Sequence, residues 1–341
     1  MKRQFYFRLA AALSAVVLIT GGIYFSRSHV SASPDFVALT STQEISIEIP
    51  QGATGSDIAQ LLAQAGVVKS FSAFFKVAVS DSRSAQVAPG VHRLDVGISA
   101  RSALNQLLDS KRIPNLVKIT EGEWTSEILA QLAKSGLSQS ALKQGLGEIT
   151  LPAGFSGTEG IFFPAQYSFP TGTLAKNALQ SMVDRFATQA QASGISAGNS
   201  DFTPMQLLTI ASIIQAEGDT QDFAKISRVI RNRRKVGMQL QMDTTVHYVL
   251  KSRGHVFLSS ASTQIASPYN TYRHFGLPPG PIGNPGADAM VAALHPAAGD
   301  WLYFITVKPG DTRFTSSDKE FLAWKSEYEK NLRAGAFGAT Q

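Results

Sequence analysis

The sequence has 341 residues, of which 44% are hydrophobic and 16% are charged, which excludes a disordered chain and predicts about two folded domains. It contains no cysteine, which excludes disulfides, thiolate zinc sites and thiol nucleophiles. The net charge is +6, but Lys2, Arg3, Arg8 and Arg27 precede the first acidic residue, leaving only +2 for the rest. This balance gives no reason to expect a nucleic-acid partner.

An uncharged segment, LAAALSAVVLITGGIYF, runs from Leu9 to Phe25 and could span about 25 Å as a helix. The heavier basic flank precedes it, so the positive-inside rule places the N-terminus in the cytosol. The segment therefore predicts a single-pass anchor in the cell (inner) membrane, with the C-terminal part extracytoplasmic. The small residues of Val30-Ser31-Ala32 leave a cleavable signal peptide as the alternative.

The next 70 or so residues predict a compact α+β module. Ile alternates with polar residues in ISIEI, which indicates a strand buried on one face. Capping residues and apolar residues at helical spacing indicate helices around it. The expected order is a strand at 45–49, helices at 54–66 and 71–79, an edge strand at 91–94 and a helix at 100–108.

The middle of the chain predicts a strand at 116–120 followed by a helix at 126–134. Residues 135–172 are rich in Gly, Ser and Pro, which favours loops, and a helix is expected at about 173–190. The Ser/Gly-rich stretch 193–201 is expected to be a surface loop. No phosphate-loop, dinucleotide, nucleophile-elbow or HExxH motif is present, and the six histidines include no i, i+4 pair, so we expect no metal site.

The most informative stretch is TPMQLLTIASIIQAEG, from Thr203 to Gly218. Thr203 and Gln206 form a capping box around a Pro at the first helical position, so the start of this helix is well specified. Glu217 falls on the same face as Ile210 and Ile214, at the C-terminal end, where the helix dipole disfavours a negative charge. Burial and dipole should both raise its pKa, as a general acid requires.

A buried glutamate paired with Arg228 or Arg231 would explain the same pattern without catalysis. Those arginines belong to a basic helix expected at about 221–236. A solvated helix face would explain its charges. A docking surface for the carboxylates of an anionic polymer is the other interpretation.

Two irregular stretches follow and contribute candidate binding residues. Gln241 and Asp243 lie in GMQLQMDTTVHY, and Tyr269, Asn270 and Tyr272 lie in the Pro/Gly-rich loop 267–286. Aromatic faces and amides on a stiff loop are typical of sugar grooves, although a structural loop explains the prolines equally well. His295, before a Pro, is expected to close a helix. The chain then predicts a hairpin over about 301–315 and a closing helix at 317–333.

The residues resemble the MltG, or YceG-like, family of endolytic murein transglycosylases over nearly the whole segment that follows the apolar run. The resemblance rests on six ordered motifs, EGIFFP (159–164), LTIASIIQAE (208–217), NRRKVGMQLQMD (232–243), SPYNTY (267–272), GLPPGPIGNPG (276–286) and AALHPA (292–297).

The resemblance implies an α+β fold with three parts. These are a cytosolic stub and transmembrane anchor at 1–33, a small βααβ LysM-like module at 34–115, and a mixed α+β catalytic transglycosylase domain at 116–341 that ends in the hairpin and closing helix. It also implies that Glu217, which ends the ASIIxxE motif, is the catalytic glutamate.

Four positions depart from many relatives of the resembled family. They have Asp where this chain has Ala165, Glu at Gln215, Pro at Thr244 and His at Arg313. Any supporting role at Ala165 and Arg313 is therefore in doubt. Gln215 indicates that the first of the family's two glutamates is dispensable, which leaves Glu217 as the acid.

The implied reaction is cleavage of the β-1,4 bond between MurNAc and GlcNAc in peptidoglycan glycan strands, without a cofactor. Glu217 would protonate the glycosidic oxygen and then take the proton of the MurNAc C6 hydroxyl as it attacks C1, leaving a 1,6-anhydro end. Gln241, Asp243, Tyr269, Asn270 and Tyr272 are the candidates for holding the sugars and the acetamido group. Asp243 could instead orient Glu217 or cap a turn.

Two other classes of function stay open at this point. One is a noncatalytic peptidoglycan-binding scaffold that docks cell-wall synthases. The other is a muramidase that uses water, with Asp243 or Asp219 as its second carboxylate. The expected partners are glycan strands, the membrane through the N-terminal segment, and cell-wall synthases.

Overall fold

The structure, a computed structural model, describes residues 33–37, 43–50, 52–169, 172–253 and 258–337. The chain divides into two compact units, Met1–Pro114 and Asn115–Gln341. Both mix helices with two-stranded antiparallel sheets, so the chain is α+β, as predicted. The expected membrane span at 9–25 lies outside the described residues, and none of the helices within them is long and apolar enough to cross a membrane.

The first unit has the element order predicted from the sequence. β1 pairs with β2 in a register that matches Ile49 with Gly90, and Ile47 and Ile49 point into the core. The capping box at Thr54 starts the first helix, since its hydroxyl accepts from the Asp57 backbone while the Asp57 side chain accepts from Thr54. The described elements are β1 (Glu44–Ile49), α2 (Gly55–Gln64), α3 (Phe71–Ser80), β2 (Gly90–Asp95) and α4 (Ala100–Leu107).

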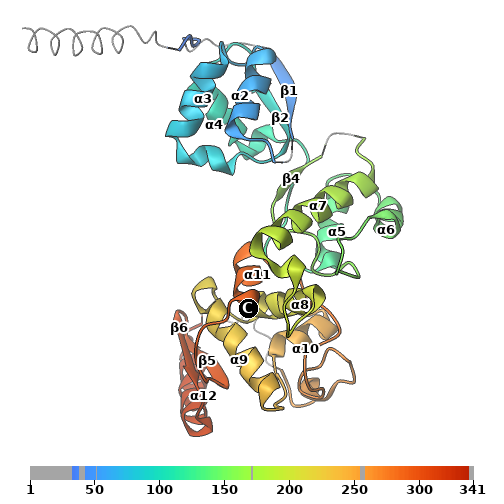
Figure 1. Ribbon diagram of the computed structural model, residues 1–341, viewed down its shortest axis with the longest axis vertical. Coiled ribbons are helices and arrows are strands. Elements are labelled where there is room, and N and C mark those ends of the chain that lie inside the picture. Colours follow the sequence, from blue (N-terminus) through green and yellow to red (C-terminus); the bar gives the residue numbers. More distant parts are fainter. Residues whose placement is uncertain (1–32, 38–42, 51, 170–171, 254–257, 338–341) are drawn as a thin grey trace, which may run out of the picture. The chain divides into compact units, whose positions relative to one another are not determined.

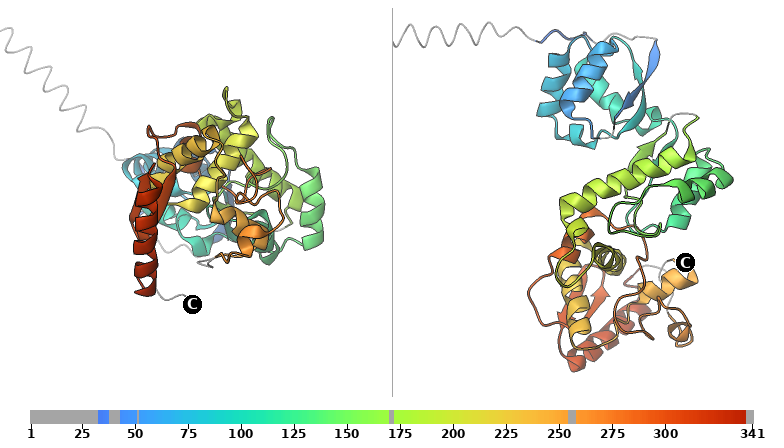
Figure 2. Two further views of the ribbon diagram at one scale, coloured as in Figure 1. Left: turned by 90° about the horizontal axis from the view of Figure 1, so that it is seen from below. Right: turned by 45° about the vertical axis from the view of Figure 1, so that its right-hand side comes forward.

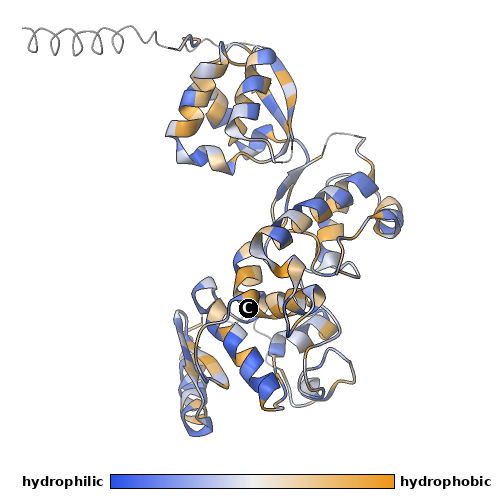
Figure 3. Ribbon diagram, in the orientation of Figure 1, coloured by the Kyte–Doolittle hydropathy of each residue, from blue (hydrophilic) through white to orange (hydrophobic). Residues whose placement is uncertain are grey.

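The second unit is built around one buried helix, α8 (Pro204–Glu217), which packs against α9 (Phe223–Lys235) and α11 (Ala287–Leu294) (Figure 1). α8 is apolar, whereas much of α9 is hydrophilic (Figure 3). The helix α7 (Ala175–Ser193) packs against α6 (Gln139–Glu148) and α11, and is preceded by α5 (Thr125–Lys134) and the short pair β3 (Leu116–Lys118) and β4 (Gln166–Ser168).

The C-terminal part has the expected hairpin and closing helix. β5 (Tyr303–Lys308) pairs with β6 (Asp311–Thr315), and α12 (Asp318–Arg333) packs along β5 (Figure 2). The Ser317 hydroxyl accepts from the Glu320 backbone and caps α12. His295 ends α11, as predicted.

Two expectations about this unit are wrong. Residues 135–172 contain the helix α6, which begins at the Ser138 cap and keeps its helical form through Gly145 and Gly147. Asp243 does not lie in an irregular stretch but begins the helix α10 (Asp243–Leu250). No side chain caps α10, so its start has no local sequence signal and is fixed instead by contacts with a distant loop.

Candidate active site

Glu217 is the last residue of α8, and its position depends on how this helix begins and ends. At the start, the Thr203 hydroxyl accepts from the Gln206 backbone at 3.3 Å, and the Gln206 side chain accepts from the Thr203 backbone at 2.9 Å. At the end, Gly218 is extended, and a Cβ there would lie 2.5 Å from Ile226 Cδ1 of α9. A larger residue at this position would have to displace the Ile226 side chain, so the end of α8 packs closely against α9.

The Glu217 carboxylate accepts from α10, which begins 26 residues further along the chain. Thr244 Oγ1 donates to Glu217 Oε1 at 2.5 Å, and the Thr244 backbone N–H lies 3.4 Å from the same oxygen. These donors come from the first turn of α10, where backbone N–H groups have no helical partners. No local pattern predicts this contact, because it joins two elements that only the fold brings together.

Burial raises the pKa of Glu217 from 4.5 to about 7. The residue as a whole is partly exposed, but protein atoms surround its carboxyl group. The Thr244 hydroxyl lowers the pKa, the nearby Asp243 carboxylate raises it, and the Arg233 guanidinium lowers it. At neutral pH the group is therefore divided between its protonated and ionised forms and can both give and take a proton.

The alternative in which Glu217 pairs with Arg228 or Arg231 is wrong. Arg228 Nε donates to the carbonyl of Ala297, and Arg231 Nη2 donates to the carbonyl of Ala293, each at 2.5 Å. Within the described part of the chain, Glu217 has no basic side chain within ion-pair distance. The Thr244 donors and the positive charge of Arg233 stabilise its ionised form instead.

Arg233 is a neighbour of Glu217 that sequence reasoning did not single out. Its side chain is only 6% exposed, and its Nε donates to the carbonyl of Leu302 at 2.6 Å. Its Nη1 donates to the carbonyl of Leu240. Arg233 thus joins α9 to the chain entering β5 and to the segment before α10, and it places a buried positive charge near Glu217.

Glu217 lines a cavity of about 810 Å³ between the end of α8, the start of α10, the C-terminal hairpin and α12. This volume is within the range of ligand-binding clefts. Three of the five predicted binding residues, Gln241, Asp243 and Tyr272, line it together with Glu217. The hairpin and α12 add aromatic lining residues that sequence reasoning missed, namely Tyr303, Phe304, Phe321 and Tyr328.

The three binding candidates in the cavity are fixed to one another. The Tyr272 hydroxyl donates to Asp243 Oδ1. Gln241 has a positive φ of 47°, and its N–H donates to the Thr271 carbonyl at 3.1 Å. The Met242 N–H donates to Thr271 Oγ1 at 2.9 Å. The loop 269–272 therefore sets the position of the segment that leads into α10 and Thr244.

A family model described as the YceG-like family matches residues 47–327. The chain belongs to the YceG-like family. It is 30% identical to a Bacillus subtilis protein named endolytic murein transglycosylase, over 92% of this chain and 91% of that protein. It is 26% identical to a Streptococcus pneumoniae protein of the same name, over 89% of this chain but only 62% of that longer protein.

A crystal structure of a YceG-like protein from Listeria monocytogenes has a similar fold. It matches this chain with a TM-score of 0.55 and 27% identity, over 83% of this chain and 99% of that one. The resemblance inferred from the sequence motifs is confirmed by these matches.

The other two binding candidates of this YceG-like chain do not line the cavity. Asn270 is fully buried, and its Nδ2 donates to the carbonyls of Thr263 and Ile265 at 3.0 and 2.8 Å. Its Oδ1 accepts from the Tyr272 N–H at 3.0 Å. Tyr269 packs against Tyr248 with ring centroids 5.1 Å apart. Both side chains hold the loop that carries Tyr272.

Replacing Asn270 by Ala should lower the free energy of unfolding by about 2 kcal/mol, because it leaves the partly buried carbonyls of Thr263 and Ile265 and the N–H of Tyr272 without their side-chain partner. Urea denaturation measures the effect, with Asn177→Ala on the exposed face of α7 as the control. An unchanged unfolding midpoint combined with lost turnover would instead support the direct sugar contact expected from the sequence.

A second buried carboxyl, Glu159 of the EGIFFP motif, has no access to this cavity. Its Oε1 accepts from the Thr125 N–H at 2.9 Å, and its Oε2 accepts from the Tyr248 hydroxyl at 3.1 Å. Burial raises its pKa. These donors occupy the carboxylate, so Glu159 ties α5 to α10. Across the described residues, no three acidic or histidine side chains are grouped to hold a metal ion.

Proposed function

We propose that this chain is a membrane-anchored lytic transglycosylase that cleaves the β-1,4 bond between MurNAc and GlcNAc in murein glycan strands. The observation that carries the proposal is a single carboxyl with a pKa of about 7, Glu217, opening into a cavity large enough for sugars. Membership of a family whose relatives are named endolytic murein transglycosylases supports the substrate and an endolytic mode of cleavage.

The reaction needs only one protein group to move protons. Protonated Glu217 donates its proton to the glycosidic oxygen as the bond to the MurNAc C1 breaks, and GlcNAc leaves as an alcohol. The Glu217 carboxylate then removes the proton of the C6 hydroxyl of the same MurNAc as its oxygen bonds to C1. The product is a 1,6-anhydro ring, and Glu217 regains its proton.

The surroundings of Glu217 suit both halves of this cycle. Burial favours the protonated form that starts the reaction, whereas the Thr244 donors and the Arg233 charge stabilise the carboxylate formed midway. The opposing influences keep the two forms close in free energy. A proton can therefore leave and return without a large barrier from either state.

Sugar binding is assigned to the side chains that line the cavity. Gln241, Asp243 and Tyr272 offer amide, carboxylate and hydroxyl groups to sugar hydroxyls and to the acetamido group, while Tyr303 and Phe304 on the hairpin offer aromatic faces. We assign Tyr269 and Asn270 an indirect role, that of positioning Tyr272. Asp243 accepts a hydrogen bond from the Tyr272 hydroxyl, which argues against its acting as a second catalytic carboxylate.

The chain's organisation follows from the sequence pattern. Residues 1–33 are assigned to a cytosolic stub and membrane anchor, residues 34–115 to a LysM-like module that binds glycan, and residues 116–341 to the catalytic domain. The uncharged run at 9–25 and its basic flank support the anchor. The βααβ order of the first unit supports the module. Cell-wall synthases are the protein partners that this location favours.

Mass spectrometry of the products released from purified murein sacculi tests the proposed function. A lytic transglycosylase leaves muropeptides that are lighter by one water than the products of hydrolysis. Products that carry ordinary reducing ends would show a water-using muramidase. Glycan binding without any product would show a noncatalytic scaffold.

Thr244→Val should shift the pH dependence of activity to higher pH. The valine keeps the shape of Thr244 and its backbone N–H but has no hydroxyl to donate to Glu217, so the ionised form loses a stabilising hydrogen bond and the pKa rises. Activity that requires protonated Glu217 is lost as pH rises through this pKa. The alkaline limb of kcat/KM should therefore move up by about half a unit to one unit. A limb that stays in place would contradict the assigned contact.

A further inference from the structure

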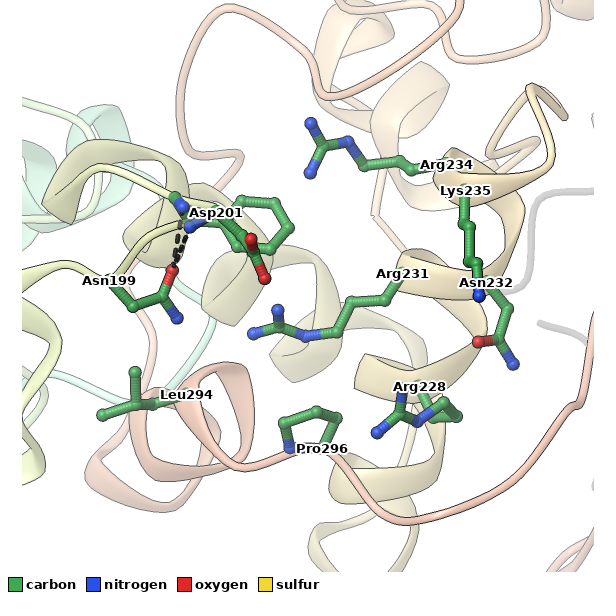
Figure 4. A pocket seen from close by; sticks show the side chains of 10 residues that line it. Asn199, Asp201, Arg228, Arg231, Asn232, Arg234, Lys235, Leu294 and Pro296 are labelled. Carbon is green, nitrogen blue, oxygen red and sulfur yellow. Dashed lines mark hydrogen bonds between the residues drawn. The ribbon is translucent and has the colours of Figure 1, made fainter.

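A second cavity, of about 650 Å³, lies along α9 and carries an excess of positive charge. It is bounded by α9, by the loop before α8 and by the end of α11 (Figure 4). Arg231 extends from α9 into the space between Asp201 on one side and Pro296 on the other. The lining residues are Asn199, Asp201, Phe202, Arg228, Arg231, Asn232, Arg234, Lys235, Leu294 and Pro296.

The charges of this cavity are not balanced within the protein. Four lining side chains are cations, and Asp201 is the one lining carboxylate. In the part of the chain that the structure describes, none of the four cations is within ion-pair distance of a carboxylate. Burial, and then the repulsion from Arg228 and Arg234, lower the pKa of Arg231, while Asp201 acts in the opposite direction.

Contacts within the protein hold the arginines in position but use only some of their N–H donors. Arg228 and Arg231 each use one donor on a backbone carbonyl. The guanidinium groups of Arg231 and Arg234 both lie 4.5 Å from the ring centroid of Phe202. Arg231 Nε is buried and finds no acceptor among the described residues. An arrangement of this kind loses little side-chain entropy when it binds an anion.

The basic cavity and the Glu217 cavity lie on different faces of the same helix. At 100° per residue, Arg228, Arg231 and Arg234 follow one stripe of α9, while Arg233 projects from the other side into the cavity of Glu217. A helix is about 10 Å across, so a flexible substituent on a sugar bound near Glu217 can reach the basic stripe.

Resting on the proposed function, we propose that this basic cavity binds the stem peptide carried by the MurNAc residues of the substrate. Stem peptides bear free carboxylates, amide groups and the amino group of a diamino acid. The guanidinium groups match the carboxylates, and Asp201 matches the ammonium group. Phe202 and Leu294 offer apolar contacts for alanine methyl groups. A bare phosphate would meet the same arginines but would be repelled by Asp201.

Isothermal titration of the full-length chain with a purified murein tetrapeptide tests the proposal without requiring turnover. Arg231→Gln combined with Arg234→Gln should weaken binding about tenfold or more, since each removes a charged donor. The control, Lys143→Gln combined with Lys176→Gln, removes two exposed positive charges from α6 and α7 and should bind like the parent. If the double variant unfolds, Arg234→Gln alone replaces it, because the Arg234 side chain makes no hydrogen bond among the residues that the structure describes.

Three results would overturn the proposal. They are no peptide binding by the parent chain, equal weakening by the lysine control, and binding of inorganic phosphate in place of the peptide. Acetylation of the peptide's amino group should also weaken binding to the parent chain but not to Asp201→Asn.

Kinetics separates a failure of this proposal from a failure of the proposed function. On peptide-bearing strands the double arginine variant should raise KM with little change in kcat, and on strands stripped of peptides it should match the parent. Equal KM values for the parent and the variant on peptide-bearing strands would overturn the peptide site while leaving the lytic activity intact. A parent chain that binds the peptide but releases no anhydro product would retain the site and contradict the proposed function.

Discussion

Glu217→Gln should reduce the release of anhydro-muropeptides by at least about 10²- to 10⁴-fold, the contribution typical of general acid-base catalysis. Glutamine keeps the size and polarity of the side chain but carries no transferable proton. The Thr244 hydroxyl can still donate to the amide oxygen, so the cavity should keep its shape. Product release measured by liquid chromatography checks the result, and a near-normal rate would remove Glu217 from the mechanism.

The same variant should not be less stable than the parent at alkaline pH. The folded pKa of about 7 lies above the ordinary value of 4.5, so between these values the folded chain holds a proton that the unfolded chain has lost. The stability due to Glu217 is present below pH 4.5 and is lost as pH rises through 7, by about 3 kcal/mol at most. Gln does not titrate, so the variant does not lose this stability. As pH rises from 5 to 8, the free energy of unfolding of the variant, measured by urea denaturation, should therefore increase relative to that of the parent. A variant that fails to fold would show that the glutamate is structural.

Arg233→Met should lower the free energy of unfolding by about 2 kcal/mol or more. Methionine fills the apolar part of the site but leaves the carbonyls of Leu240 and Leu302 without their donor. Removing the buried charge should also raise the pKa of Glu217, because the field of Arg233 lowers it in the parent chain. Urea denaturation and the pH profile of kcat/KM measure the two effects on one protein.

Lys319→Met is the matched control, since it removes a positive charge from an exposed position on α12 that lines neither cavity. It should unfold at the same urea concentration as the parent and keep the same pH profile. If Arg233→Met behaves like this control, then Arg233 neither supports the hairpin nor acts on Glu217.

Much of the frame of the site follows from local sequence. The capping box at Thr203 and Gln206, the proline at the first helical position and Gly218 specify both ends of α8. The alternating and turn residues of the last 40 positions specify the hairpin and α12. These are short-range signals, in which a few neighbouring residues satisfy the backbone groups at the ends of an element.

The environment of Glu217 does not follow from local sequence. Its pKa depends on Thr244, Asp243 and Arg233, which reach the carboxyl only after α8, α9 and α10 have packed. The side of α9 that faces Glu217 is set by that packing, which is why Arg233 lines the Glu217 cavity and Arg231 does not. The burial of Asn270 depends likewise on backbone carbonyls at 263 and 265, which no side-chain pattern reveals.

Digestion of murein sacculi in ¹⁸O-labelled water, followed at once by borohydride reduction and mass spectrometry, tests the central claim most directly. If Glu217 directs the C6 hydroxyl of MurNAc to C1, the new ends contain only oxygen from the glycan, and no label enters the products. The Glu217→Gln chain should release such ends at least about 10²-fold more slowly. Labelled oxygen at C1 of the newly formed MurNAc ends would show that water is the nucleophile and would contradict the account.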